Sequence, residues 1–167
     1  MSSSNTPIET SALHLRTLRR ITLAAALLVT VQTAVGMLVN LYVSVPTKHP
    51  GAHPGSYLGG SLRSVAWAVG HGPVALAVHA TLGLALVAVA VWVAVRAVWR
   101  GPRRVALAAM LGALFSIGAG FNGASFLDFN NMISSLIMGL LALCALSSYL
   151  IGIYLSPTGG HRRGNEF

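Results

Sequence analysis

His79 is the residue whose position in this chain most strongly suggests chemistry. It stands inside an apolar stretch from Gly72 to Trp99, which is long enough to cross the roughly 30 Å hydrocarbon core of a bilayer. Ionisable side chains in such spans are rare and usually face the interior of a helix bundle, so each one is a candidate functional site. Gly83 follows one turn later on the same face and would let another helix approach closely. The first question is therefore what His79 contacts.

Two methionines are candidate partners of His79 in holding a cofactor. Counting inward from the end of each predicted span that faces the same side places Met37, His79 and Met138 at one depth, about 10 Å into the hydrocarbon. Imidazole and thioether groups are both axial ligands of haem iron. The alternative is that both methionines fill gaps between packed helices.

A polar stripe on the first span offers His79 a hydrogen-bonding partner. Gln32, Gly36 and Asn40 recur at every fourth position and share one helix face. In lipid, Gln32 and Asn40 must find hydrogen bonds, either with another helix or in a polar pocket. We predict that His79 faces the bundle interior within reach of this stripe. A stripe of small residues on the third span predicts a close packing seam; it consists of Ala108, Gly112, Ser116 and Gly120.

One acidic residue lies near the membrane surface, in the segment NGASFLDFNN at positions 122–131. One interpretation is that Asp128 caps the start of the fourth span near Asn131. The other is that its carboxylate lies at the mouth of the bundle near His71. In that case Asp128 and Asn122 would extend a pocket that also contains Gln32, Asn40 and His79.

Three histidines outside the predicted spans form a second candidate site. His49 and His53 belong to the repeat HPGAHPG, and His71 ends the same loop. Imidazole is a good ligand for zinc and copper, so these three residues are candidate metal ligands. The alternative is a flexible outer loop, because proline and glycine do not preorganise a metal site.

The composition is that of an integral membrane protein. Of the 167 residues, 54% are hydrophobic and 8% are charged, against about 25% charged in soluble domains. The net charge of +8 is attributed to topology signals at helix ends rather than to nucleic-acid binding. The single cysteine, Cys144, excludes an internal disulfide. There is no phosphate-binding loop, HExxH or GxSxG motif, and no complete catalytic set is visible.

The hydropathy pattern predicts an all-α integral membrane protein, an up-down-up-down bundle of four transmembrane helices in a single domain. The second half of the long outward loop, residues 61–70, suits a short interfacial helix with Trp67 at the level of the headgroups. The two ends of the chain are predicted to be disordered. The expected ranges are spans at 21–45, 72–99, 105–121 and 132–155, an outward loop at 46–71, and tails at 1–12 and 156–167.

Basic residues predict the orientation. They flank the start of the first span and surround the turn at 100–104, and two more lie in the C-terminal tail, whereas the other two loops hold only Lys48 and Arg63. Because cytoplasmic loops carry the excess of Lys and Arg, both termini are expected in the cytoplasm of a multi-pass protein of the bacterial inner (plasma) membrane.

The pair His79 and Gly83 resembles helices of membrane b-type cytochromes and of haem A synthase. The resemblance implies that His79 would ligate a haem b iron. It covers one span, and no other span contains a histidine. The second ligand would therefore be Met37, Met138, a His79 of another copy, or absent. The whole chain also resembles small four-span membrane proteins of actinobacteria.

Three functions follow as hypotheses. The first is an accessory subunit that packs against a larger membrane complex, with a membrane-protein partner or further copies of itself. The second is a haem-binding membrane cytochrome built on His79. The third is a transporter or sensor with an outward-facing polar pocket. An absorption spectrum separates the second from the other two.

Overall fold

A computed structural model describes residues 7–53 and 55–156, and every regular element in this part of the chain is an α-helix. The five helices are α1 (Pro7–Tyr42), α2 (Tyr57–His71), α3 (Val74–Arg100), α4 (Arg103–Phe129) and α5 (Met132–Leu155). Within the described residues, four helices are long and apolar enough to cross a membrane: α1 from Leu13 onward, α3, α4 and α5. The prediction of an all-helical fold with four such helices is confirmed.

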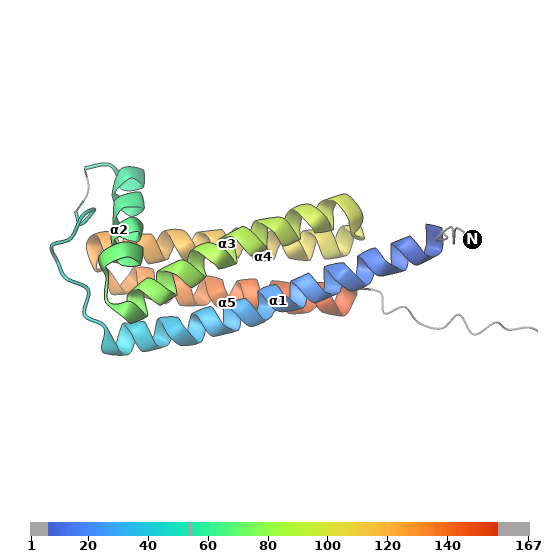
Figure 1. Cartoon of the computed structure of the whole chain (residues 1–167), viewed down its shortest axis with the longest axis horizontal. Helices are drawn as coiled ribbons and strands as arrows, with labels where there is room; N and C mark the ends of the chain where they lie inside the picture. Colours follow the sequence, from blue (N-terminus) through green and yellow to red (C-terminus); the bar gives the residue numbers. More distant parts are fainter. Residues whose placement is uncertain (1–6, 54, 157–167) are drawn as a thin grey trace, which may run out of the picture.

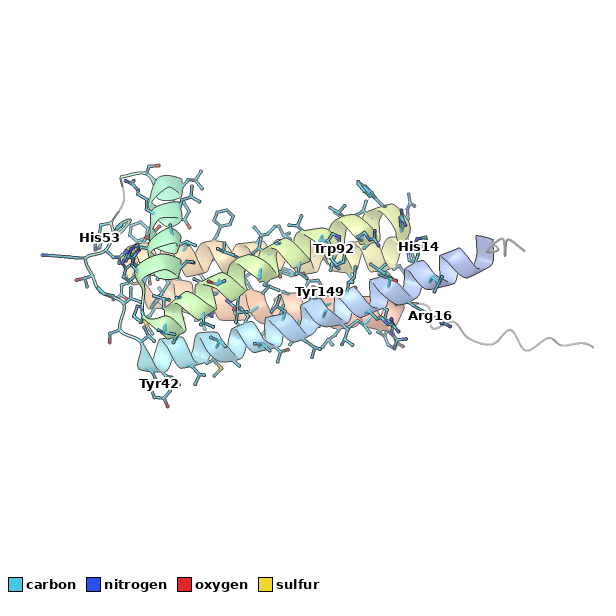
Figure 2. All side chains as sticks on the ribbon, in the orientation of Figure 1. His14, Arg16, Tyr42, His53, Trp92 and Tyr149 are labelled. Carbon is cyan, nitrogen blue, oxygen red and sulfur yellow. The ribbon has the colours of Figure 1, made fainter. Side chains whose placement is uncertain are left out.

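The four long helices form one bundle, and α2 lies across one end of it (Figure 1). Helix α1 packs against α3 and α5, and α4 packs against the same two helices, so the four close into a ring. Helix α2 contacts α3 and α4. The main core is built largely from alanine and valine, with Tyr149 as its largest fully buried side chain (Figure 2). Small side chains allow the helices to approach closely, which is how helices associate in lipid.

The connections between the last three helices are short. Gly101 and Pro102 join α3 to α4, and a proline before a helix start needs no backbone N–H. Asn130 ends α4 in the left-handed conformation with φ 49°, which asparagine tolerates better than most residues. Asn131 then caps α5, because its side-chain oxygen accepts a hydrogen bond from the Ile133 backbone N–H at 3.0 Å.

Several boundaries differ from those expected. Helix α4 continues to Phe129 instead of ending near residue 121, since Asn122 bonds back to the Gly118 carbonyl at 2.9 Å and does not interrupt the helix. The short helix of the long loop covers residues 57–71 instead of 61–70. Part of the predicted N-terminal tail is helical, because α1 starts at Pro7. Residues 1–6 and 157–167 of the predicted tails lie outside the described residues.

Candidate functional site

His79 lies in the seam between α1 and α3, where it contacts the predicted stripe. The Gln32 side-chain amide of α1 donates a hydrogen bond to the backbone carbonyl of His79 at 3.0 Å, and the same nitrogen is 3.5 Å from the ring Nε2. A Cβ added to Gly36 would lie 2.8 Å from Cε1 of His79, so the ring lies directly on the glycine. The prediction that His79 lies within reach of the stripe is confirmed at Gln32 and Gly36, whereas Asn40 bonds to Ser135 of α5.

Gly83 contributes to the same seam from α3. A Cβ added there would lie 3.0 Å from the amide nitrogen of Gln32. The two helices therefore use one glycine each to admit the other's polar side chain: Gly36 admits His79, and Gly83 admits Gln32. This reciprocal arrangement accounts for the spacing of four residues on both helices.

Two polar atoms in this seam have no hydrogen-bond partner among the described residues. They are Oε1 of Gln32 and Nδ1 of His79, and both are buried. The Gln32 amide is fixed in this orientation, because its N–H groups face an oxygen and a ring nitrogen. In the tautomer in which Nε2 accepts from this amide, the imidazole proton resides on Nδ1. Gln32 and His79 thus use only part of their hydrogen-bonding capacity on each other, and the two unpartnered atoms are not exposed to solvent.

The other members of the predicted cofactor and pocket sets lie elsewhere. Met37 is 63% exposed on the surface of α1, and the sulfur of Met138 lies beside Gly123, between α4 and α5. Asn40 accepts a hydrogen bond at 3.4 Å from Ser135 of α5. Neither methionine is placed on the His79 ring by these contacts, and Asn122 is occupied within α4.

Asp128 forms a second, separate polar site at the end of the bundle covered by α2. Its carboxylate is 1% exposed and accepts a hydrogen bond on each oxygen, from the hydroxyl of Ser61 at 2.8 Å and from that of Ser64 at 2.6 Å. Both serines belong to α2. The interpretation of Asp128 as the N-cap of the fourth span is wrong, because α4 extends past it and Asn131 holds the cap. Its hydrogen bonds go to Ser61 and Ser64, not to His71.

The loop between α1 and α2 is fastened to the same end of α4. His49 donates from Nε2 to the Leu127 carbonyl at 3.0 Å and stacks on Trp67 of α2 with ring centroids 4.4 Å apart. The backbone N–H of His53 donates to the Asp128 carbonyl at 3.0 Å. The candidate metal ligands His49 and His53 are therefore loop residues that contact the end of α4, whereas His71 is exposed at the end of α2. Across residues 7–53 and 55–156, no three His, Cys, Asp or Glu side chains are grouped so that they could hold a metal ion.

Gly51 is required at the point where this loop meets α2. Its φ of 102° lies in the left-handed region that favours glycine. A Cβ there would also lie 2.6 Å from both the Gly60 carbonyl oxygen and the Ser64 backbone nitrogen. Because both neighbours are backbone atoms, any side chain at position 51 would lift the loop off α2.

Sequence reasoning missed Ser61, Ser64 and Tyr149. The signal for the two serines was present, because Gly60, Ser61, Ser64 and Ala68 form one face of small residues on α2, and this is the face that is buried. Tyr149 was signalled by the small-residue seam of α4, since Gly112 of that seam packs against the tyrosine ring. The predicted third-span seam is thus a packing surface, for α5 at Ala108 and Gly112 and for α3 at Gly120.

Comparisons with known proteins add no family to these observations. No model of a protein family, no curated protein and no solved structure matches this chain.

Proposed function

We propose that the chain is a small non-catalytic accessory subunit of a membrane protein complex. It crosses the bacterial inner membrane four times as an up-down-up-down bundle, with both termini in the cytoplasm. The support for insertion is that four helices have the length and hydropathy of membrane spans. Large apolar side chains are exposed along all four, which suits contact with lipid or with other membrane proteins.

The distribution of basic residues supports the orientation. Arg100, at the end of α3, approaches His14 of α1 to 2.7 Å, and Leu18 lies beside Gly101. His14 is labelled at this end of the bundle in Figure 2. The start of α1 and the turn between α3 and α4 therefore lie together at one end of the bundle. Arginines gather at this end, as cytoplasmic ends do; they are Arg16, Arg19, Arg20, Arg96, Arg100, Arg103 and Arg104.

The observation that carries the accessory role is that the candidate polar residues of the spans bond mainly to one another and to the backbone. Gln32 is used on His79, and Asp128 is used on Ser61 and Ser64. A hollow of about 300 Å³ on α3 is lined by Ala77, Val78, Thr81 and Leu82, and includes none of these polar residues. A transporter or sensor pocket would need Gln32, Asn40, His79 and Asp128 to share one cavity. Instead, Gln32 bonds to His79 of α3, Asn40 bonds to Ser135 of α5, and Asp128 bonds to two serines of α2.

Photo-cross-linking in living cells tests the proposal. A photoreactive residue is placed at one exposed leucine on each long helix, while the chain remains in its native membrane; the positions are Leu27, Leu84, Leu114 and Leu140. We expect at least one helix face to give a discrete protein adduct, and the others to give none because they face lipid. Absence of an adduct from all four faces would contradict the accessory role.

Two further outcomes separate the alternatives. An adduct with the mass of two copies of this chain would show that the partner is a second copy of the chain, in a homo-oligomer. A haem Soret band in the absorption spectrum of the purified protein would favour the cytochrome built on His79, for which His79→Leu is the matched variant. We expect no such band, since Cε1 of the His79 ring lies on Gly36 and its Nε2 faces the Gln32 amide.

A further inference from the structure

Helix α2 has two different faces, and only one of them is packed inside the protein. The buried face consists of small residues, Gly60, Ser61, Ser64 and Ala68, that lie against α4 and the loop. The larger apolar side chains are on another face, where Leu58 is 62% exposed and Leu62 is 74% exposed. A helix that buries serine and glycine while exposing leucine is the reverse of a helix in a water-soluble protein.

The exposed residues form a stripe, which we call the α2 apolar stripe and define as Leu58, Leu62, Val65 and Val69. Their spacing places all four within about 60° of one another round the helix. Val65 in this stripe is partly buried and packs against the apolar cluster of the outer end, which contains Val39, Leu76 and Leu127. Val65 therefore joins one edge of the stripe to the bundle, while Leu58, Leu62 and Val69 remain exposed.

Trp67 packs against the same cluster from the other flank of the buried face, and it marks the side of α2 that faces the loop. Trp67 lies about 140–180° round the helix from Leu58, Leu62 and Val69. It stacks on His49 of the loop that joins α1 to α2. In Figure 1 this loop passes on the side of α2 remote from the bundle. The face opposite Trp67 then points back along the four long helices.

The amino-terminal half of α2, which carries the exposed Leu58 and Leu62, extends past α3 and α4 in Figure 1. We propose that the α2 apolar stripe rests on the outer leaflet of the bilayer, with Leu58 and Leu62 at the boundary between headgroups and acyl chains. This proposal rests on the membrane insertion proposed above. A helix that lies across the end of membrane spans, with leucines directed along them, meets this boundary first.

Arg63 supports lipid as the occupant. It is exposed next to Leu62, about 100° round the helix from it, and its Nε donates to the Gly59 carbonyl at 2.9 Å. This leaves the outer guanidinium N–H groups free to contact lipid phosphate beside the inserted leucines. Basic residues flanking an apolar stripe are typical of helices that lie in the membrane surface.

Site-directed spin labelling in vesicles of phosphatidylethanolamine and phosphatidylglycerol tests the proposal. The labels are attached to Leu62→Cys and Leu58→Cys in the full chain with Cys144→Ala, and collision rates with oxygen and with a water-soluble nickel chelate are compared. We expect both labels to collide several-fold more with oxygen than with nickel. Ser56→Cys, at the exposed N-cap of α2, is the matched control and should show a clearly smaller ratio.

A label at Leu140→Cys, on the exposed face of α5, reports the membrane insertion itself. If Leu140 is lipid-exposed while both α2 labels collide freely with nickel, the α2 proposal is overturned and the insertion stands. If the Leu140 label also collides freely with nickel, the proposed membrane insertion fails. Immobilised α2 labels that are shielded from both reagents would assign the stripe to a protein partner and overturn the lipid proposal.

Discussion

The two buried polar sites of this protein, the His79 seam and the Asp128 cluster, are satisfied to different degrees. In the seam, Gln32 bonds the His79 carbonyl, yet Oε1 of Gln32 and Nδ1 of His79 have no partner among the described residues. At Asp128, each carboxylate oxygen accepts a hydroxyl hydrogen bond of 2.8 Å or shorter. The charged site is thus the better satisfied one, and the neutral site is the one with unused hydrogen-bonding capacity.

The difference follows from what each site holds in place. Helices α1 and α3 also pack through alanine and valine along their length, so the His79 contact is one among many. Helix α2 is short, and beside the packing of Ala68, Val65 and Trp67 its attachment relies on the two hydroxyl–carboxylate bonds. A buried hydrogen bond to a charged group contributes about 1.5–3 kcal/mol. Asp128 should therefore be essential to the fold near α2, and His79 replaceable.

The largest effect should come from Asp128→Ala. The change removes both acceptors and leaves the hydroxyls of Ser61 and Ser64 buried without a partner, a loss of about 3–5 kcal/mol for α2 docking. Hydrogen exchange of the α2 amides should rise strongly, while that of α5 should change little. Asn131→Ala is the control, because it removes a helix cap worth about 1 kcal/mol without touching α2.

Combining Asp128→Ala with Ser61→Ala and Ser64→Ala sharpens this result. Removing both sides of a buried hydrogen bond costs less than removing one, so the triple variant should recover part of the lost α2 protection. Unchanged exchange of α2 in Asp128→Ala would show that the loop contacts of His49 and Gly51 hold α2 by themselves.

Gly112→Ala should have the next largest effect. A Cβ there would lie 2.5–2.9 Å from three ring atoms of Tyr149, which is fully buried and has no room to move. Helices α4 and α5 must then separate, at about 1–3 kcal/mol. Thermal unfolding in detergent measures the loss. Gly139→Ala on α5 is matched, since a Cβ there meets nothing within 4 Å, and equal stability of the two variants would refute the close seam.

How far the sequence predicts this structure depends on the range of the interaction. The helices follow from local hydropathy, and the contact of His79 with Gln32 and Gly36 follows from period-four stripes on neighbouring spans. Asp128 could not be paired with Ser61 and Ser64 in this way. That contact joins residues more than sixty positions apart, and its register depends on a proline- and glycine-rich loop whose path no periodicity describes.

The misreading of Asp128 has a local cause. A cap assignment depends on where the preceding helix ends, and the segment after residue 121 contains glycine and asparagine, which favour turns. In the structure, Asn122 bonds within α4 and the helix continues, so the cap moves to Asn131. Met37 shows the same limit, because equal depth in two helices says nothing about which way each side chain points.

Gly36→Ala should cost less than Gly112→Ala. The added Cβ would lie 2.8 Å from Cε1 of His79, but this ring is only partly buried and can turn aside, so we expect about 1 kcal/mol. The double variant with His79→Ala isolates the contact, because the cost of Gly36→Ala should disappear when the ring is absent. Additive losses in thermal unfolding would mean that the ring does not lie on Gly36.

The smallest effect should come from His79→Leu. Gln32 keeps its main bond, since that bond goes to the backbone carbonyl of residue 79, and the buried Nδ1 without a partner is removed. Measured side-chain hydrogen bonds between membrane helices average about 0.6 kcal/mol, so the free energy of unfolding should change by less than about 1 kcal/mol in either direction. The photo-cross-linked adduct should also persist. Gln32→Leu is the sharper comparison, because it removes the amide that spans α1 and α3 and should be more destabilising than His79→Leu. If His79→Leu folds normally but loses the adduct or a haem spectrum, the imidazole is a functional group, and the seam is a site rather than a packing contact.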